Sequence, residues 1–100
     1  MKVTRENVFQ SSLIQTLNNV FPKCIITKND PNYIQGIPDL TIKVGSKWAD
    51  IEVKKSALEP HQPNQDYYIN EANRMGALGL FIYPENLKES IEKLKLYFLE

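Results

Sequence analysis

Hydrophobic residues recur at helical spacing near the start of the chain. This stripe consists of Phe9, Leu13, Leu17 and Val20. Such spacing is typical of an amphipathic helix, which we expect to run from Arg5 to about Val20. Thr4 suits the N-cap because its hydroxyl can accept a hydrogen bond from the first turn. Pro22 suits the end of the helix, since proline cannot continue it.

The same spacing predicts two further helices in the second half of the chain. One is expected from Pro63, which suits a first helical position, to about Met75. Gly76 would end that helix, because helices commonly end at a glycine with a left-handed backbone conformation. The last helix has one apolar face, made of Leu87, Ile91, Leu94 and Phe98.

Between the helices, hydrophobic residues follow the patterns of strands. Residues 24–27 and 78–83 are short apolar runs, and residues 39–44 and 48–54 alternate between apolar and polar. Gly45-Ser46 joins the alternating pair and suits a type II′ hairpin turn. The predicted order is α-β-β-β-α-β-α. This order indicates an α/β fold in which helices flank a mixed central sheet, with residues 1–100 forming a single domain.

The hairpin turn fixes which residues of its two strands face each other. If Val44 opposes Lys47, then Asp39 opposes Glu52, and Lys54 lies on their side of the sheet. Opposed Cβ atoms are roughly 4.5–5.5 Å apart, so the two carboxylates would repel each other. Lys54 or a bridging divalent cation would offset that repulsion. A solvated face of an antiparallel sheet would show the same alternation.

Glu6 is a second anomaly, because it falls on the apolar stripe of the first helix. A carboxylate on a buried stripe needs a partner, and together with Asp39 and Glu52 it suggests a third acidic group directed at one site. Alternatively, Glu6 is solvated in the first turn, where the helix dipole favours an acidic residue.

The amino-acid composition limits the kinds of metal site and the cellular setting that the sequence allows. The 100 residues have zero net charge, and no apolar run is as long as a membrane span or a signal peptide requires. A single cysteine, Cys24, excludes an internal disulfide and favours a reducing, cytoplasmic setting. Cys24 and His61 together cannot supply a zinc site. A metal site would therefore use oxygen ligands, which favours Mg²⁺, Mn²⁺ or Ca²⁺.

Two short motifs resemble those of a known superfamily. The segments are Gly-Ile-Pro-Asp-Leu at 36–40 and Asp-Ile-Glu-Val-Lys-Lys at 50–55. They are similar to the signature of the PD-(D/E)XK nucleases, and most similar to the branch of VRR-NUC domains and phage Holliday-junction-resolvase-like proteins. The resemblance extends from about Glu6 to the last strand. It implies a restriction-endonuclease-like fold and a metal-dependent nuclease of a bacterium or phage-infected host cell.

The resemblance also implies roles for particular residues. Mg²⁺ or Mn²⁺ would be bound by Asp39, Glu52 and the backbone carbonyl of Val53, with Glu6 reaching the metal through water. Whether one or two metal ions act stays open.

Lys54 would approach the attacking water and the scissile phosphate. Because neighbouring carboxylates favour the charged ammonium, Lys54 is expected to orient water and stabilise charge rather than act as a base. Gln65 resembles the glutamine beside the active site on the following helix, with Gln62 as its rival. We prefer Gln65 because it shares a helix face with Ile69 and Ala72.

Nucleic acid is the expected partner. Residues 1–58 contain eight Lys or Arg and five Asp or Glu, whereas residues 59–100 contain four and seven. Candidate phosphate contacts are therefore Arg5, Lys23, Lys28, Lys43, Lys47 and Lys55. Trp48 and Tyr33 could stack on bases, although packing is the commoner role of such residues.

A chain this short has no separate element for reading sequence. We therefore expect an endonuclease selective for branched, junction or flap DNA, with RNA an open alternative substrate. A catalytically inactive nuclease-fold module that binds DNA or protein is the second hypothesis. Surplus apolar residues in the last helix, among them Leu96 and Leu99, suggest a homodimer.

Overall fold

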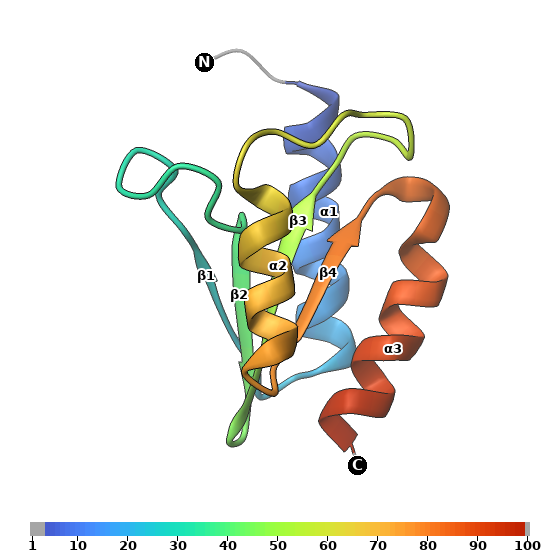
Figure 1. Cartoon of the computed structure of the whole chain (residues 1–100). Helices are drawn as coiled ribbons and strands as arrows, with labels where there is room; N and C mark the ends of the chain where they lie inside the picture. The colour runs from blue at the N-terminus through green and yellow to red at the C-terminus, as the bar shows by residue number, and fades with distance from the viewer. Residues whose placement is uncertain (1–3, 100) are drawn as a thin grey trace.

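A four-stranded sheet with helices on both faces forms the structure of the protein (Figure 1). The computed structural model describes residues 4–99. The elements in chain order are α1 (Arg5–Val20), β1 (Ile25–Lys28), β2 (Leu40–Val44), β3 (Lys47–Val53), α2 (Gln65–Arg74), β4 (Leu78–Ile82), the 3-10 helix η1 (Pro84–Asn86) and α3 (Leu87–Leu99). The predicted order α-β-β-β-α-β-α is confirmed, with η1 as an additional turn before the last helix.

The strand order is β1-β2-β3-β4, in which the first three strands are antiparallel and β4 is parallel to β3. The predicted hairpin register is confirmed, because Leu40 pairs with Ile51 and Val44 with Lys47. Gly45 has a φ of 62°, as the first loop residue of a type II′ turn requires. The parallel connection from β3 to β4 passes through α2, as such crossovers usually do.

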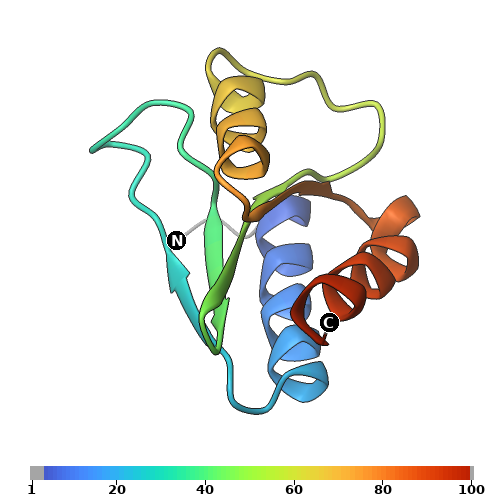
Figure 2. The same ribbon diagram turned by 60° about the horizontal axis from the view of Figure 1, so that its bottom comes forward.

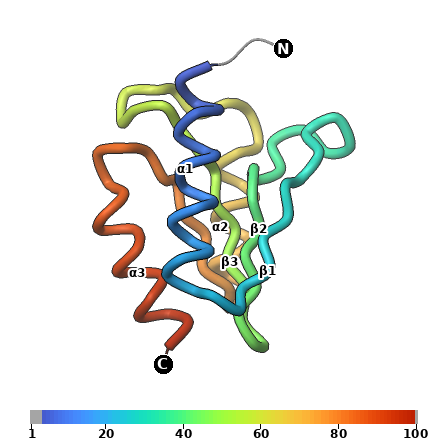
Figure 3. Tube along the Cα trace, turned by 180° about the vertical axis from the view of Figure 1, so that it is seen from behind, coloured from blue at the N-terminus to red at the C-terminus, as the bar shows by residue number. Residues whose placement is uncertain are grey.

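The helices form two layers around the sheet. Helix α2 covers one face, and α1 and α3 cover the other, as the views from below and behind show (Figures 2 and 3). The main core lies between the sheet and the α1–α3 layer. It includes Leu13, Leu17, Leu40, Ile42, Ile51, Val53, Ile82 and Leu94, all with no exposed surface. Burial of this apolar area is the main stabilising contribution to the fold.

Several predicted element boundaries are shifted by one or two residues. The strand expected at residues 24–27 is Ile25–Lys28. The second helix begins at Gln65 rather than at Pro63, because Asn64 has a left-handed backbone with a φ of 71°. Gly36 packs against this turn so closely that an added Cβ would lie 2.5 Å from the Cβ of Asn64. The contact joins the loop before β2 to the start of α2.

The N-cap of α1 and the glycine that follows α2 are as predicted. The Thr4 hydroxyl accepts a hydrogen bond from the Asn7 N–H at 3.1 Å, and Gly76 follows α2 with a φ of 91°. None of the helices within residues 4–99 has the length and apolar character needed to cross a membrane.

Candidate active site

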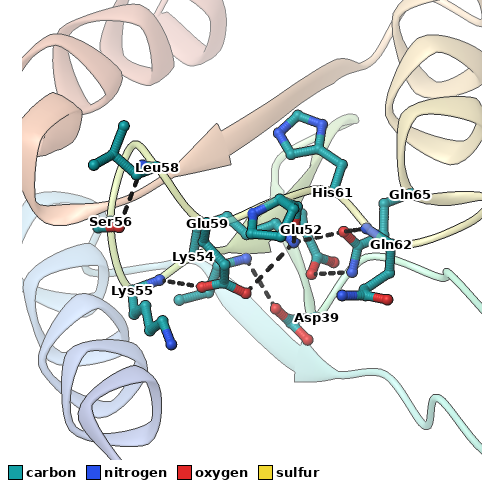
Figure 4. Close-up of polar contacts among 12 residues, drawn as sticks. Asp39, Glu52, Lys54, Lys55, Ser56, Leu58, Glu59, His61, Gln62 and Gln65 are labelled. Carbon is teal, nitrogen blue, oxygen red and sulfur yellow. Dashed lines mark hydrogen bonds and ion pairs between the residues drawn. The ribbon is translucent and has the colours of Figure 1, made fainter.

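Asp39 and Glu52 meet at one end of the β2–β3 hairpin. Asp39 immediately precedes β2, and the Val53 N–H donates a 2.8 Å hydrogen bond to its Oδ2 atom. Glu52 lies near the end of β3 with only 5% of its surface exposed. The two carboxyl groups are close enough to share a hydrogen bond when one carries a proton. The predicted juxtaposition of these side chains on one side of the sheet is therefore what the structure shows (Figure 4).

Burial makes this carboxyl pair difficult to ionise. Desolvation, reinforced by the charge of Asp39, raises the pKa of Glu52 to about 8 despite the nearby Lys54 ammonium. Desolvation also raises the pKa of Asp39, although the Val53 N–H opposes that rise. The buried Oε1 atom of Glu52 has no hydrogen-bond partner among the described residues. Such an atom is costly to leave unpaired, and either a proton shared with Asp39 or a bound cation would supply the missing interaction.

Lys54 lies near these two carboxyl groups, and its positive charge favours their ionised forms. Its backbone N–H bonds to the Ile82 carbonyl at 2.9 Å, which extends the β3–β4 pairing by one residue. Its side chain is only 2% exposed. The Nζ atom donates to Gln65 Oε1 at 2.6 Å and to Pro60 O at 3.2 Å, and lies 3.6 Å from Glu59 Oε2. Lys54 and Glu52 therefore lie close together, as predicted, because both bind the side chain of Gln65.

Gln65 joins the ammonium to the carboxylate. Its Nε2 atom donates to Glu52 Oε2 at 2.9 Å, while its Oε1 atom accepts from Lys54. The same oxygen accepts from the Gln62 backbone N–H at 2.9 Å. Gln65, the first residue of α2, is therefore the glutamine whose side chain contacts the cluster. The residue Gln62 is exposed and contributes its backbone.

Two further acidic residues complete the surroundings of Lys54. Glu6, in the first turn of α1, is half-buried and lies beside Glu59, and burial together with that neighbour raises the pKa of Glu6 to about 7. Glu59 belongs to the loop between β3 and α2, and its Oε1 atom accepts a 2.7 Å bond from the Lys55 N–H. Glu59 was not predicted from the sequence, because it follows no periodic pattern and only the loop conformation brings it back to Lys54.

The predicted phosphate-contacting residues divide between the two ends of the sheet. Those at the carboxylate end are Arg5 in the first turn of α1, Lys28 at the end of β1 and Lys55 after β3. The structure does not bring Lys23, Lys43 and Lys47 to this end, because they lie near the hairpin turn and the end of α1. The Lys47 ammonium instead donates to the Tyr97 carbonyl at 2.8 Å.

Tyr33 and Trp48, the two residues that could stack on bases, differ in how far they are exposed. Tyr33 is 82% exposed in the loop between β1 and β2, so its expected packing role is wrong. Trp48 is half-buried on the sheet face that α2 covers, opposite Lys43.

The residues present fit a hard divalent cation. Within residues 4–99, no three His, Cys, Asp or Glu side chains form a ready-made cation cage. The available donors are the Asp39 and Glu52 carboxylates, with the Val53 carbonyl directly after Glu52. A small oxygen set completed by water suits Mg²⁺, which usually binds one or two carboxylates and keeps several waters. The unpartnered Glu52 Oε1 atom supports this fit.

Comparison with known proteins defines the fold. No family model matches the sequence, and no curated protein matches it. A solved structure called "VRR_NUC domain protein" has a TM-score of 0.72 at 16% identity, covering 98% of this chain and 93% of its own. Another, called "VRR_NUC domain", has a TM-score of 0.73 at 20% identity, covering 90% and 97%.

These similarities cover nearly the whole chain, so the protein has the fold of these two solved structures. More narrowly, its fold is that of the VRR-NUC domains, as the resemblance of the two sequence motifs implied.

Proposed function

We propose that this protein is a metal-dependent endonuclease that hydrolyses phosphodiester bonds in DNA. The observation that carries the proposal is the buried Asp39–Glu52 pair, which has an unpartnered Glu52 oxygen and lies near enough to Lys54 for its charge to act on both carboxyl groups. The VRR-NUC fold supports a nuclease reaction. Perturbed carboxyl groups gathered at one end of a sheet are typical of a catalytic site rather than of a structural one.

In this proposal the side chains divide the work of hydrolysis. Asp39, Glu52 and the Val53 carbonyl hold Mg²⁺ or Mn²⁺, and Glu6 reaches it through water. The bound ion would supply an activated water and neutralise charge on the phosphate. Lys54 orients the attacking water and stabilises negative charge developing on the phosphate. Gln65 positions Glu52 and Lys54 relative to each other through one amide group.

Cleavage assays test this proposal. Purified protein is incubated with plasmid, linear duplex, four-way junction and flap DNA, with Mg²⁺, with Mn²⁺ or with EDTA. We expect metal-dependent cleavage, fastest on the branched substrates. Asp39→Asn and Lys54→Gln should each lower the rate about 100-fold or more. Asp30→Asn, which neutralises an exposed acidic residue in the loop before β2, should leave the rate unchanged.

The competing hypothesis is a module that binds DNA or protein without cutting. Calorimetry with Mn²⁺ separates the two, because the nuclease requires a cation at Asp39 and Glu52. Absence of both cleavage and Mn²⁺ binding in the wild-type protein would favour the binding module. Cleavage that survives Asp39→Asn would place the catalytic site elsewhere. Parallel assays on RNA decide whether cleavage is restricted to DNA.

We also propose that the active form is a homodimer, which would bring two sites to two strands. Leu96 and Leu99 on α3 are 67% and 72% exposed, which supports an apolar contact surface there. Analytical ultracentrifugation should show a dimer in the wild type and a monomer in Leu96→Ser/Leu99→Ser. A monomeric wild-type protein at every concentration tested would contradict this proposal.

A further inference from the structure

Two N–H groups of the Lys54 ammonium are hydrogen-bonded in this structure, and Glu59 faces the ammonium as an ion-pair partner. An ammonium has three donors, and Lys54 faces three acceptors, Gln65 Oε1, Pro60 O and Glu59 Oε2. Because Lys54 is only 2% exposed, a phosphate oxygen that contacts its ammonium would have to take the place of one of these acceptors.

Glu59 is the acceptor that can leave. The Gln65 side chain is also fixed by Glu52 and by the Gln62 N–H, and Pro60 contributes a backbone carbonyl. Glu59 makes the longest of the three contacts, at 3.6 Å, and its side chain remains 18% exposed. It is thus both the weakest partner and one that solvent can reach.

The Glu59 carboxylate lies between two donors that could also bind a phosphate, with the Glu6 carboxyl as its acidic neighbour. One oxygen faces the Lys54 ammonium and the other accepts the Lys55 backbone N–H at 2.7 Å. A buried cation and a backbone N–H are donors that commonly bind phosphate oxygens. Figure 4 shows the Glu59 carboxylate between these two residues.

We propose that the Glu59 carboxylate occupies the position of a substrate phosphate, and that a phosphodiester group of the nucleic acid binds there by displacing it. This inference rests on the proposed nuclease function and adds a residue that limits access to its substrate site. Only non-covalent contacts change: Lys54 and the Lys55 N–H exchange a carboxylate for a phosphate.

The loop that carries Glu59 is fixed on either side of it. Before Glu59, the Ala57 N–H bonds to Glu85 Oε2 at 3.2 Å. After it, the His61 ring stacks on Phe81 with centroids 4.0 Å apart. Glu59 can therefore rotate toward solvent while both anchors of the loop stay in place.

Glu59→Gln tests the proposal, with Glu85→Gln as the matched control. Each variant removes one negative charge from a side chain that accepts a backbone N–H of the same loop, but only Glu59 contacts Lys54. Affinity for a fluorescent branched oligonucleotide is measured in EDTA at fixed ionic strength. We expect Glu59→Gln to bind about tenfold more tightly than the wild type, and Glu85→Gln to differ by less than about twofold.

A second comparison isolates Lys54. In Glu59→Gln/Lys54→Gln, the gain in affinity should disappear, because the phosphate no longer meets an ammonium. If Lys54→Gln does not fold, the comparison of Glu59→Gln with Glu85→Gln still tests the proposal. Equal gains in Glu59→Gln and Glu85→Gln would mean a general charge effect and would overturn the proposal.

Other outcomes separate this inference from the proposed function. Weaker Mn²⁺ binding by Glu59→Gln, without tighter DNA binding, would make Glu59 a metal ligand and overturn the inference. No oligonucleotide binding by either protein would also overturn it. Wild-type cleavage without an affinity gain in Glu59→Gln removes the inference alone. An affinity gain in a protein that never cleaves removes the proposed function alone.

Discussion

At the residue scale, the carboxyl cluster is an arrangement that costs stability. Glu52 is almost fully buried, lies against Asp39, and leaves its Oε1 atom without a partner among the described residues. A sequence selected for stability alone would not place two acids there, since apolar or amide side chains avoid the repulsion. Such local conflicts are expected where function rather than folding decides the residue.

Glu52→Gln should therefore make the metal-free protein more stable while removing metal binding. The new amide nitrogen at the Oε1 position can donate to Asp39, and the amide oxygen can still accept from Gln65. We expect the free energy of unfolding at pH 8 to rise by about 1–2 kcal/mol, which is about 5–10 °C in Tm for a domain of this size. Thermal melts in EDTA and calorimetry with Mn²⁺ measure both effects. A less stable Glu52→Gln protein would contradict the assignment of strain to this pair.

Asn29 is a residue whose role only the structure shows. Its side-chain amide donates to Pro38 O at 2.8 Å and to Thr41 Oγ1 at 3.0 Å, and its backbone N–H bonds to Asp39 O at 2.9 Å. Asn29 thus fixes the backbone on both sides of Asp39. In the sequence it belongs to a polar loop with no periodicity, so it could not be predicted.

Asn29→Ala should weaken metal binding without touching the metal ligands. It removes both side-chain bonds, and we expect a loss of about 1–2 kcal/mol in unfolding free energy. Loss of a residue that orients a ligand typically weakens metal affinity about 10–100-fold. Mn²⁺ calorimetry on the folded variant measures this, with Asn32→Ala, an exposed residue of the same loop, as control. Unchanged Mn²⁺ affinity in Asn29→Ala would show that Asp39 holds its position alone.

At the element scale, the hairpin was predictable and the connection after it was not. Alternation and the Gly45-Ser46 turn determine the register of β2 and β3, and that register places Asp39 beside Glu52. The start of α2 depends instead on contacts between distant segments, such as Gly36 against Asn64. Glu59 lies in the same connection between β3 and α2. The alternation of apolar and polar residues therefore predicted the Asp39–Glu52 pair but not the position of Glu59.

The contact between α2 and β4 determines where Gln65 lies. An added Cβ at Gly79 would be 2.4 Å from the Ile69 carbonyl oxygen, so Gly79→Ala must push α2 away from the sheet. We expect a loss of about 1–3 kcal/mol in unfolding free energy and weaker Mn²⁺ binding, because Gln65 moves away from Glu52. Urea denaturation and Mn²⁺ calorimetry measure the two effects.

Gly45→Ala is the control for this displacement. Its cost arises from the φ of 62° in the hairpin turn, where nothing lies within 4 Å of an added Cβ. We expect a stability loss of about 1–2 kcal/mol with unchanged Mn²⁺ affinity. Equal losses of Mn²⁺ affinity in both variants would indicate general destabilisation instead of movement of α2.

At the scale of the whole molecule, the carboxyl cluster should make stability depend on pH in an unusual direction. The pKa of Glu52 is raised to about 8 and that of Glu6 to about 7, and burial also raises the pKa of Asp39 and of Asp50. The folded protein therefore binds more protons than the unfolded chain above the ordinary carboxyl pKa of about 4.5. Stability is then lost as the pH rises from that value through about 8.

Thermal melts of the metal-free protein test this dependence. Between about pH 5.5 and pH 8.5 in EDTA, we expect Tm to fall by about 5–10 °C. Mn²⁺ at the higher pH should restore Tm, because the cation replaces the protons that the carboxylates have lost and binds only the folded state. In Glu52→Gln the fall should be smaller, since the group with the highest of these raised pKa values no longer ionises. A metal-free wild-type protein whose Tm rises over this interval would show that the carboxylates are ionised without cost, and the argument for a cation between Asp39 and Glu52 would lose its physical basis.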